Sequence, residues 1–207
     1  MRDRPDAISR RELAKRDKHD RILAAARELF TRLGVSAVTT QQVADRADVA
    51  IGTLYLYAST KAELLIMVQN EKFAAAIKDG LQASARTSSD HPVDGVLSLL
   101  RPVVACVREQ VENGRTYLHE LIFGDPTEPY RRAGLELSAR LEDGIASILA
   151  RGGAIERADA ATLARVITAV IHVSTTATLY IHRSVEDVLA DIRTQLQAVL
   201  ALRADPA

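Results

Sequence analysis

The segment VAIGTLYLYAST, residues 49–60, decides the fold, because its two possible structures belong to different architectures. Read alone, TLYLY alternates small or apolar residues with aromatic ones at period two, which is typical of a half-buried strand. No second strand-like run lies nearby to pair with it, and an isolated strand is unstable. On a helix, Leu54 turns inward while Thr53 and Tyr57 share the opposite face. We therefore predict a helix that exposes hydroxyl groups.

The residues before this segment predict a helix-turn-helix. Apolar residues recur at three- and four-residue steps from Asp20 to Leu33, which indicates an amphipathic helix, and Gly34 is placed to end it. Thr40 is positioned as the N-cap of a second, short helix, QQVADRA. Only residues 48–50 separate that helix from the next, so two short helices joined by a tight turn are expected.

The rest of the chain also predicts helices. Thr60 and Glu63 have the spacing of a capping box, which opens a long helix running to about Ala85. Pro102 is expected to kink or split the helix that follows the breaker SSDHP, residues 88–92. Further helices are expected at 115–123, at 130–151 with Gly152-Gly153 as the stop, at 158–182, and at 185–202 after a Ser184-x-x-Asp187 cap. The predicted fold class is all-α, with an arm (1–17), a three-helix helix-turn-helix domain (18–66) and a helical C-terminal domain (67–207).

Charge distinguishes the two ends of the chain. The 207 residues carry 27 basic and 27 acidic side chains, but residues 1–61 hold 12 basic and 8 acidic ones. A basic N-terminal part on a neutral chain favours a polyanion as its partner, although a solvated charged face would have the same composition. One cysteine, Cys106, excludes an intrachain disulfide, and we find no signal peptide and no membrane-length apolar run. A cytoplasmic protein with no membrane partner is expected.

Residues 21–67 closely resemble the DNA-binding domain of the TetR family of bacterial transcriptional regulators. The stretch RILAAARELFTRLGVSAVTTQQVADRADVAIGTLYLYASTKAELL has the family's first helix, glycine, capping threonine, helix-turn-helix, GT-x-Y-x-[HY] reading helix and Lys-x-x-Leu opening in the same order and spacing. It departs from the common pattern at Asp48, where Gly is usual, at Ala50, where a Ser or Thr cap is usual, and at Ala58, where Phe is common. These changes bear on stability, because none removes a group expected to face DNA.

The resemblance implies roles for individual residues. A threonine and two glutamines open the second helix beside phosphate, the glycine and threonine of the reading helix approach bases or phosphate, and two tyrosines and a lysine resemble phosphate clamps. The reading helix has no Arg, Asn or Gln, so bidentate base reading must come from Gln41, Gln42, Arg46 or arginines of the arm in the minor groove. The implied DNA-binding residues are Thr39, Thr40, Gln41, Gln42, Gly52, Thr53, Tyr55, Tyr57, Lys61, Arg10 and Arg11.

Two polar groups mark the C-terminal part. His172, Thr176 and Tyr180 fall four residues apart on an otherwise apolar helix. Three interpretations stay open for this stripe: a ligand cavity, a dimer interface or a buried, satisfied polar row. The second group, Tyr117, His119 and Glu120, is another candidate lining group with the same alternatives. No metal site is expected, because adjacent residues such as His119 and Glu120 lack the three- or four-residue spacing of helical metal ligands.

The resemblance implies a ligand-responsive repressor. It is expected to be a homodimer built from residues 158–202 that binds double-stranded DNA at an inverted repeat and leaves it when a small hydrophobic or aromatic effector enters the C-terminal cavity. No enzyme signature occurs, so no catalytic activity and no cofactor are expected. The alternatives are a helical small-molecule-binding protein or enzyme whose helix-turn-helix no longer binds DNA, and an interfacial membrane binder that uses the arm.

Overall fold

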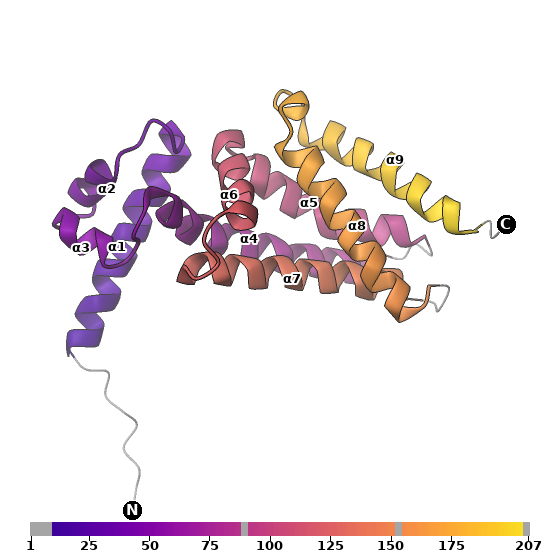
Figure 1. The fold of residues 1–207 in the computed structure, drawn as a ribbon, viewed down its shortest axis with the longest axis horizontal. Helices are drawn as coiled ribbons and strands as arrows, with labels where there is room; N and C mark the ends of the chain where they lie inside the picture. The colour runs from indigo at the N-terminus through magenta and orange to yellow at the C-terminus, as the bar shows by residue number, and fades with distance from the viewer. Residues whose placement is uncertain (1–9, 88–90, 152–154, 205–207) are drawn as a thin grey trace, which may run out of the picture.

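A computed structural model describes residues 10–87, 91–151 and 155–204, and every regular element in these ranges is helical, which confirms the all-α prediction. Three helices form the N-terminal part, which stands to one side of a larger bundle of long helices (Figure 1). In chain order the elements are α1 (Arg10–Leu33), α2 (Thr40–Arg46), α3 (Ile51–Tyr55), α4 (Lys61–Arg86), α5 (Pro92–Arg108), α6 (Val111–Phe123), α7 (Pro129–Leu149), α8 (Arg157–Thr176), the short 3-10 helix η1 (Thr178–Tyr180) and α9 (Val185–Ala204).

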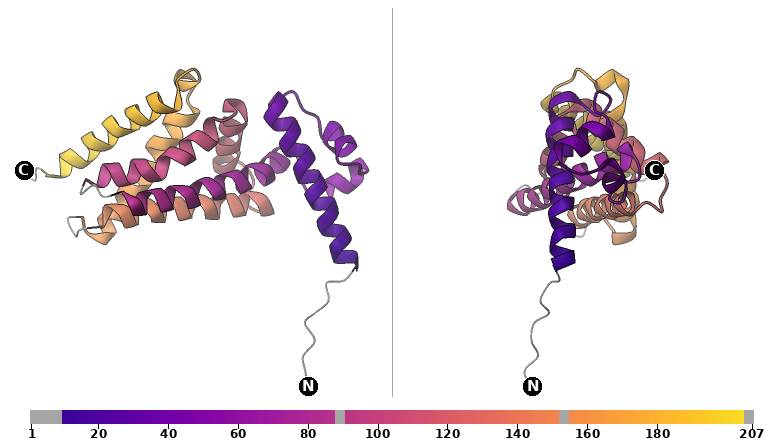
Figure 2. Two further views of the ribbon diagram at one scale, coloured as in Figure 1. Left: turned by 180° about the vertical axis from the view of Figure 1, so that it is seen from behind. Right: turned by 90° about the vertical axis from the view of Figure 1, so that its left-hand side faces the viewer.

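Two hydrophobic cores share one helix. The N-terminal core joins α1, α2 and α3 to the start of α4, through side chains such as Phe30, Leu54 and Leu65. The C-terminal core begins on the same helix with Ile66 and Phe73 and extends through α5 to α9. Figure 2 shows α4 running from the N-terminal part into the middle of the bundle. Because α4 is packed into both cores, it fixes the distance between the two parts.

The N-terminal helices differ in detail from their prediction. α1 begins at Arg10, so residues 10–17 of the predicted arm are helical, and residues 1–9 lie outside the described ranges. The N-cap of α2 is Thr39 and not Thr40: its hydroxyl accepts from the backbone of Gln42, whose side chain accepts in return. α3 spans only five residues, so Tyr57 lies in the turn that follows.

Four local features of this part lie at the predicted residues. Gly34 ends α1 with a φ of 79°, and Asp48 takes the left-handed conformation with a φ of 52°. Ala50 begins α3 without a side-chain hydrogen bond to cap it. Thr60 caps α4 by accepting from the backbone of Glu63, but the Glu63 carboxylate binds Ser59, one residue before the cap.

In the C-terminal part, the helix predicted at 158–182 is wrong at its end. α8 stops at Thr176, Ala177 is extended, and Tyr180 belongs to η1. The predicted polar stripe is therefore broken before its last member. α5 is continuous through Pro102 and is not split. Residues 88–90 of the predicted breaker and the Gly152-Gly153 stop lie outside the described residues, whereas the Ser184 and Asp187 cap is present.

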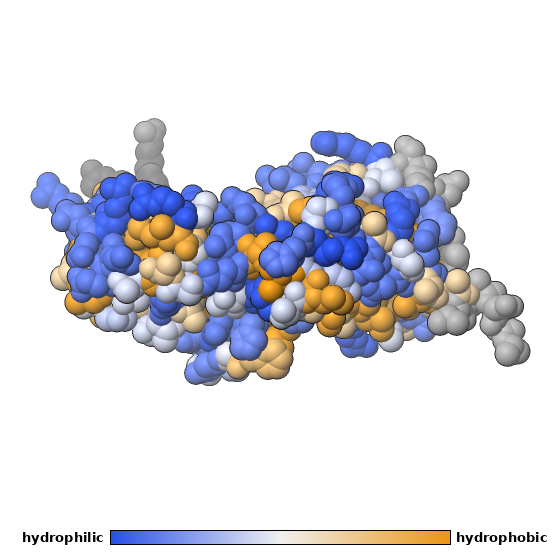
Figure 3. All heavy atoms as spheres, turned by 90° about the horizontal axis from the view of Figure 1, so that it is seen from above, coloured by the Kyte–Doolittle hydropathy of each residue, from blue (hydrophilic) through white to orange (hydrophobic). Residues whose placement is uncertain are grey.

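The face of the molecule shown in Figure 3 is mainly hydrophilic, with apolar patches on both parts. The C-terminal part exposes several large apolar side chains of α6 and α8. They include Phe123, which is 70% exposed, and Val166 and Val173, which are 42% and 56% exposed. No helix in the described ranges is both long and apolar enough to cross a membrane.

Candidate DNA-binding surface and ligand cavity

Three hydrogen-bonding side chains that are far apart in the sequence meet at the start of α2. The hydroxyls of Thr40 and Tyr55 lie 3.1 Å apart, which joins the first turn of α2 to the last residue of α3. The Lys61 ammonium donates to the carbonyl oxygen of Val38 at 3.1 Å, directly before the α2 cap. These two contacts place one cation and two hydroxyls near the α2 cap, and a set of this kind can bind an oxyanion such as a phosphate.

The remaining predicted contacts on α2 and α3 are placed around this set. Gln41 is exposed and donates to the Asp45 carboxylate at 2.7 Å, while Gln42 belongs to the capping box of α2. Thr53 is half-buried and Gly52 is exposed. A Cβ added at Gly52 would meet no other atom of the chain within 4 Å. The bare backbone of α3 at this glycine therefore faces open space.

Four other predicted contacts lie elsewhere. Tyr57 is half-buried, and its hydroxyl donates to the carbonyl oxygen of Lys15 in α1 at 3.1 Å. Arg46 is bound to the Glu28 carboxylate at 2.7 to 2.9 Å. Arg10 and Arg11 are exposed in the first turn of α1. The structure thus gives Tyr57 a bracing role between α3 and α1, and it leaves the two arginines free of the cluster at α2.

One residue that supports this surface is absent from the prediction. The Arg21 guanidinium donates to the carbonyl oxygens of Ala47 and Asp48, at 3.0 and 3.2 Å. These carbonyls end α2 and form the turn before α3, so Arg21 holds the helix-turn-helix from α1. Its distance of 26 residues along the sequence gives no local signal that could have revealed the contact.

A largely apolar cavity of about 410 Å³ lies in the C-terminal part between α4, α5, α6, α7 and α8. Its wall includes Phe73, Val104, Leu121 and Leu141, and its few polar groups include His172 and Arg165. A cavity of this volume and character is suited to an apolar small molecule that a few polar groups orient.

His172 separates this cavity from a neighbouring hollow that also contains His119, Thr176 and Arg115. Burial lowers the pKa of His172, and the nearby His119 lowers it further. At neutral pH the imidazole is therefore held in its uncharged form, which both donates and accepts a hydrogen bond. Two predicted lining residues, His119 and Thr176, thus meet His172 at this second hollow.

The other three predicted ligand contacts lie outside both sets of lining residues. Tyr117 is buried in the core, stacked edge-on to Phe73, and its hydroxyl donates to Asn70 at 2.9 Å. The Glu120 carboxylate is paired with Arg131. Tyr180 stands in η1, where a hydrogen bond to Asp191 raises the pKa of its hydroxyl.

Two further chemical features bear on function. Burial raises the pKa of the Cys106 thiol to about 11, so the thiol is protonated at neutral pH and is a weak nucleophile. Within the residues that the structure describes, no three His, Cys, Asp or Glu side chains are grouped so that they could hold a metal ion.

Sequence comparison finds a known family whose profile matches the N-terminal part. The family profile described as "Bacterial regulatory proteins, tetR family" matches residues 22–68. The HTH-type transcriptional repressor KstR of Mycobacterium tuberculosis is 43% identical over 61 residues, which cover 30% of this chain and 28% of that protein. KstR of Rhodococcus jostii is 42% identical over 60 residues, 29% of this chain and 28% of that protein. The chain therefore matches just over a quarter of the length of these relatives.

Solved structures share the fold over nearly the whole chain. A TetR transcriptional regulator from Rhodococcus sp. RHA1 has a TM-score of 0.67 at 23% identity, covering 90% of this chain and 97% of its own. Thermus thermophilus FadR, a TetR family repressor solved in complex with lauroyl-CoA, has a TM-score of 0.67 at 20% identity, covering 86% and 92%. At these identities, the comparison shows that the arrangement of the helices is shared.

Proposed function

We propose that this chain, whose residues 22–68 match the profile of the tetR family of bacterial regulatory proteins, is a DNA-binding transcriptional repressor of that family. The observation that carries the proposal is the cluster of Thr40, Tyr55 and Lys61 at the start of α2, beside the open backbone of Gly52. The cluster supplies phosphate contacts, and the α2–α3 unit enters the major groove with Gly52 and Thr53 toward the bases. Residues 18–66 form the DNA-binding domain, and residues 67–207 form the effector and dimerisation domain.

The test is a titration against duplex DNA. A duplex selected by the protein from a random pool, titrated at two salt concentrations, should bind more weakly at the higher salt, because phosphate contacts release counterions. The proposal would be contradicted if the protein enriched no sequence from the pool and its binding to duplex DNA did not change with salt concentration.

The effector is an apolar small molecule bound in the cavity of the C-terminal part. The lining by Phe73, Val104 and Leu121 supports this choice, and His172 and Arg165 at the same wall supply orienting groups. Thermus thermophilus FadR was solved with lauroyl-CoA, so an acyl chain is the first compound class to test, with aromatic molecules as the second. The ligand releases the DNA by binding the DNA-incompetent conformation more tightly, with a coupling on the order of 5 to 150-fold.

The active form is a homodimer that binds an inverted repeat, because a two-fold dimer mirrors its site. Val166 of α8 is 42% exposed and lies outside the cavity wall, which supports an interface that includes this helix. Sedimentation at micromolar concentration tests the dimer directly, and a monomer there would contradict it.

A rival function is a small-molecule-binding protein whose helix-turn-helix no longer binds DNA. Its support is the uncapped start of α3 at Ala50. The same titration separates the two functions, since the rival binds an apolar ligand in the cavity but enriches no duplex.

A further inference from the structure

The corner between α6 and α7 is built around a buried arginine. Only 3% of the Arg131 side chain is exposed, and charged side chains are rarely buried unless they are paired. Its Nε donates to the carbonyl oxygen of Glu120 at 2.7 Å, and its terminal nitrogens donate to the Glu120 carboxylate at 2.8 Å, to the carbonyl of Asp125 at 2.9 Å and to the Glu128 carboxylate. A Cβ at Gly124 would overlap the guanidinium, so the loop leaves this space to Arg131.

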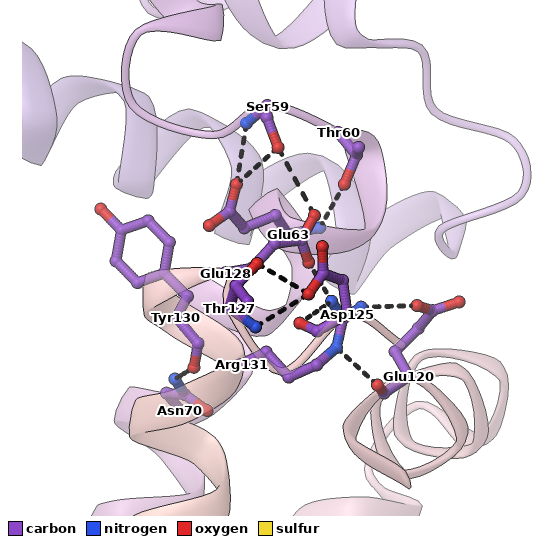
Figure 4. Close-up of polar contacts among 10 residues, drawn as sticks. All are labelled: Ser59, Thr60, Glu63, Asn70, Glu120, Asp125, Thr127, Glu128, Tyr130 and Arg131. Atoms are coloured by element: carbon purple, nitrogen blue, oxygen red, sulfur yellow. Dashed lines mark hydrogen bonds and ion pairs between the residues drawn. The ribbon is translucent and has the colours of Figure 1, made fainter. Parts of the chain in front are cut away.

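This corner contacts the linker between the reading helix and α4. The Ser59 hydroxyl lies 3.5 Å from the Glu128 carboxylate and 2.9 Å from the Glu63 carboxylate, which also accepts from the Ser59 backbone at 2.9 Å (Figure 4). The backbone of Glu63 in turn donates to Thr60, the cap of α4. A continuous series of contacts therefore runs from Arg131 to the residue that joins the reading segment to α4.

The charges in this series are unequal. Glu63, Glu120 and Glu128 supply three carboxylates, and Arg131 supplies one guanidinium. Ser59 has a single hydroxyl proton, which it can donate to only one of the two carboxylates it faces. The positive charge of Arg131 offsets the negative charge of Glu128. Glu128 can therefore lie near Glu63, a residue that is only 4% exposed. Without Arg131, two carboxylates of like charge would face each other across Ser59, and one of them, Glu63, is buried.

The start of α7 touches both halves of the molecule. Tyr130, the neighbour of Arg131, packs against the N-terminal core and the C-terminal core. Its carbonyl accepts from Asn70 of α4 at 2.7 Å, and Asn70 accepts from Tyr117, which stacks on Phe73 of the cavity wall. The contact that supports the linker is therefore connected to the cavity through buried and half-buried residues.

We propose that Arg131 is a positioning residue for DNA binding: by neutralising Glu128 it seats the α6–α7 corner on Ser59 and fixes the orientation of the helix-turn-helix relative to the C-terminal part. It touches no DNA itself. The proposal rests on the proposed function for its DNA readout, but the orientation of the two parts is measurable without DNA.

The test measures orientation in the full-length chain. Spin labels at Ala24→Cys in α1 and Ala139→Cys in α7, both exposed positions, are placed in a Cys106→Ser background and diluted with unlabelled protein to give intrachain distances. Arg131→Met should broaden the distance distribution, and it should weaken binding to the selected duplex on the order of tenfold, within the usual range of coupling between sites. Arg131→Lys, which keeps the charge, should retain most of the wild-type distribution.

Two comparisons separate positioning from a general structural role. Adding Glu128→Gln to Arg131→Met removes the repulsion and should narrow the distribution again, whereas a loss of packing alone would not be rescued. Arg108→Met removes another buried arginine, whose guanidinium binds the carbonyls of Tyr180 and Ile181 at 2.9 and 3.2 Å, and should leave the α1 to α7 distance unchanged.

The outcomes decide the proposal. An unchanged distribution in Arg131→Met, or no rescue by Glu128→Gln, would overturn it. If Arg131→Met does not fold, Ser59→Ala, at an exposed position, is measured in its place. A broader distribution of the α1 to α7 distance in Ser59→Ala supports the proposal, and a wild-type distribution refutes it. If the wild-type protein selects no duplex, the proposed function fails, and the distance measurements still test the role of Arg131.

Discussion

Replacing Gly52 by alanine is expected to stabilise the protein and to weaken its DNA binding. The glycine lies in α3, and a Cβ added there would meet no atom of the chain within 4 Å. Inside a helix, alanine is favoured over glycine by about 1 kcal/mol. Gly52 is the second residue of a five-residue helix, so the gain should not exceed this value, and we expect an increase of about 0.5 to 1 kcal/mol in the free energy of unfolding.

The same methyl group should obstruct the duplex. If the bare backbone of Gly52 lies against a base edge or phosphate, the added carbon must displace it, and overpacking of this kind costs about 1 to 3 kcal/mol. At about 1.4 kcal/mol for each factor of ten, affinity for the selected duplex should fall roughly 5- to 150-fold. Urea titration measures the first effect, and fluorescence anisotropy with labelled duplex measures the second.

Two variants serve as controls. Ala50→Ser adds a cap to the same helix and should stabilise it by about 1 kcal/mol without weakening DNA binding. This outcome would show that a more stable α3 does not by itself weaken DNA binding. Gly80→Ala should destabilise, because its Cβ would overlap the carbonyl oxygen of Leu99. A Gly52→Ala protein that is more stable and binds the duplex as tightly as wild type would refute the assignment of Gly52 to the DNA interface.

Three further predictions concern separate parts of the molecule. Lys61→Ala should weaken binding to all duplexes about equally and reduce the salt slope by about one, because a phosphate contact carries no base information; a changed base preference at one position would contradict this. Val166→Asp, at an exposed position of α8 outside the cavity wall, should give a folded monomer in sedimentation and lose tight binding to the inverted repeat. The pKa of His172 is lowered in the folded chain, so the unfolded chain binds a proton at this residue first as the pH falls. Lowering the pH from about 7.5 to about 5.5 should therefore destabilise the wild-type protein more than the His172→Gln variant, as measured by urea titration.

The helix-turn-helix was predictable because its signals are local. Gly34 and Asp48 adopt positive φ at the two points where the sequence placed a helix stop and a tight turn, and Thr60 caps the long helix that follows. The one-residue error at the α2 cap arose because Thr39 and Thr40 are equally suitable by type, and only the reciprocal bond with the Gln42 side chain selects Thr39.

The end of α8 was not predictable, because it depends on contacts from other helices. The apolar period continues past Thr176, but Arg115 of α6 donates to the carbonyl of Thr176 at 2.6 Å. Arg108 of α5 donates to the carbonyls of Tyr180 and Ile181 in the following turn. These donors satisfy backbone groups that a continuing helix would have bonded internally, so the chain can turn back toward α9. The predicted stripe of three polar residues therefore keeps His172 and Thr176 together and loses Tyr180.

The linker between α3 and α4 combines a local signal that the sequence reveals with a long-range contact that it does not. The sequence identifies Thr60 as a cap and predicts a phosphate contact for Lys61, since both belong to a contiguous motif. It gives no sign that Ser59, in the same motif, is contacted by Glu128 from 69 residues further along. Under the role proposed for Arg131, the DNA affinity of the helix-turn-helix depends on a residue of the C-terminal part, which lies outside the segment matched by the family profile. Relatives that match this chain only over the N-terminal segment should therefore share its phosphate contacts, while the spacing of half-sites that each one prefers should differ, and binding to a series of duplexes with varied spacers measures that difference directly.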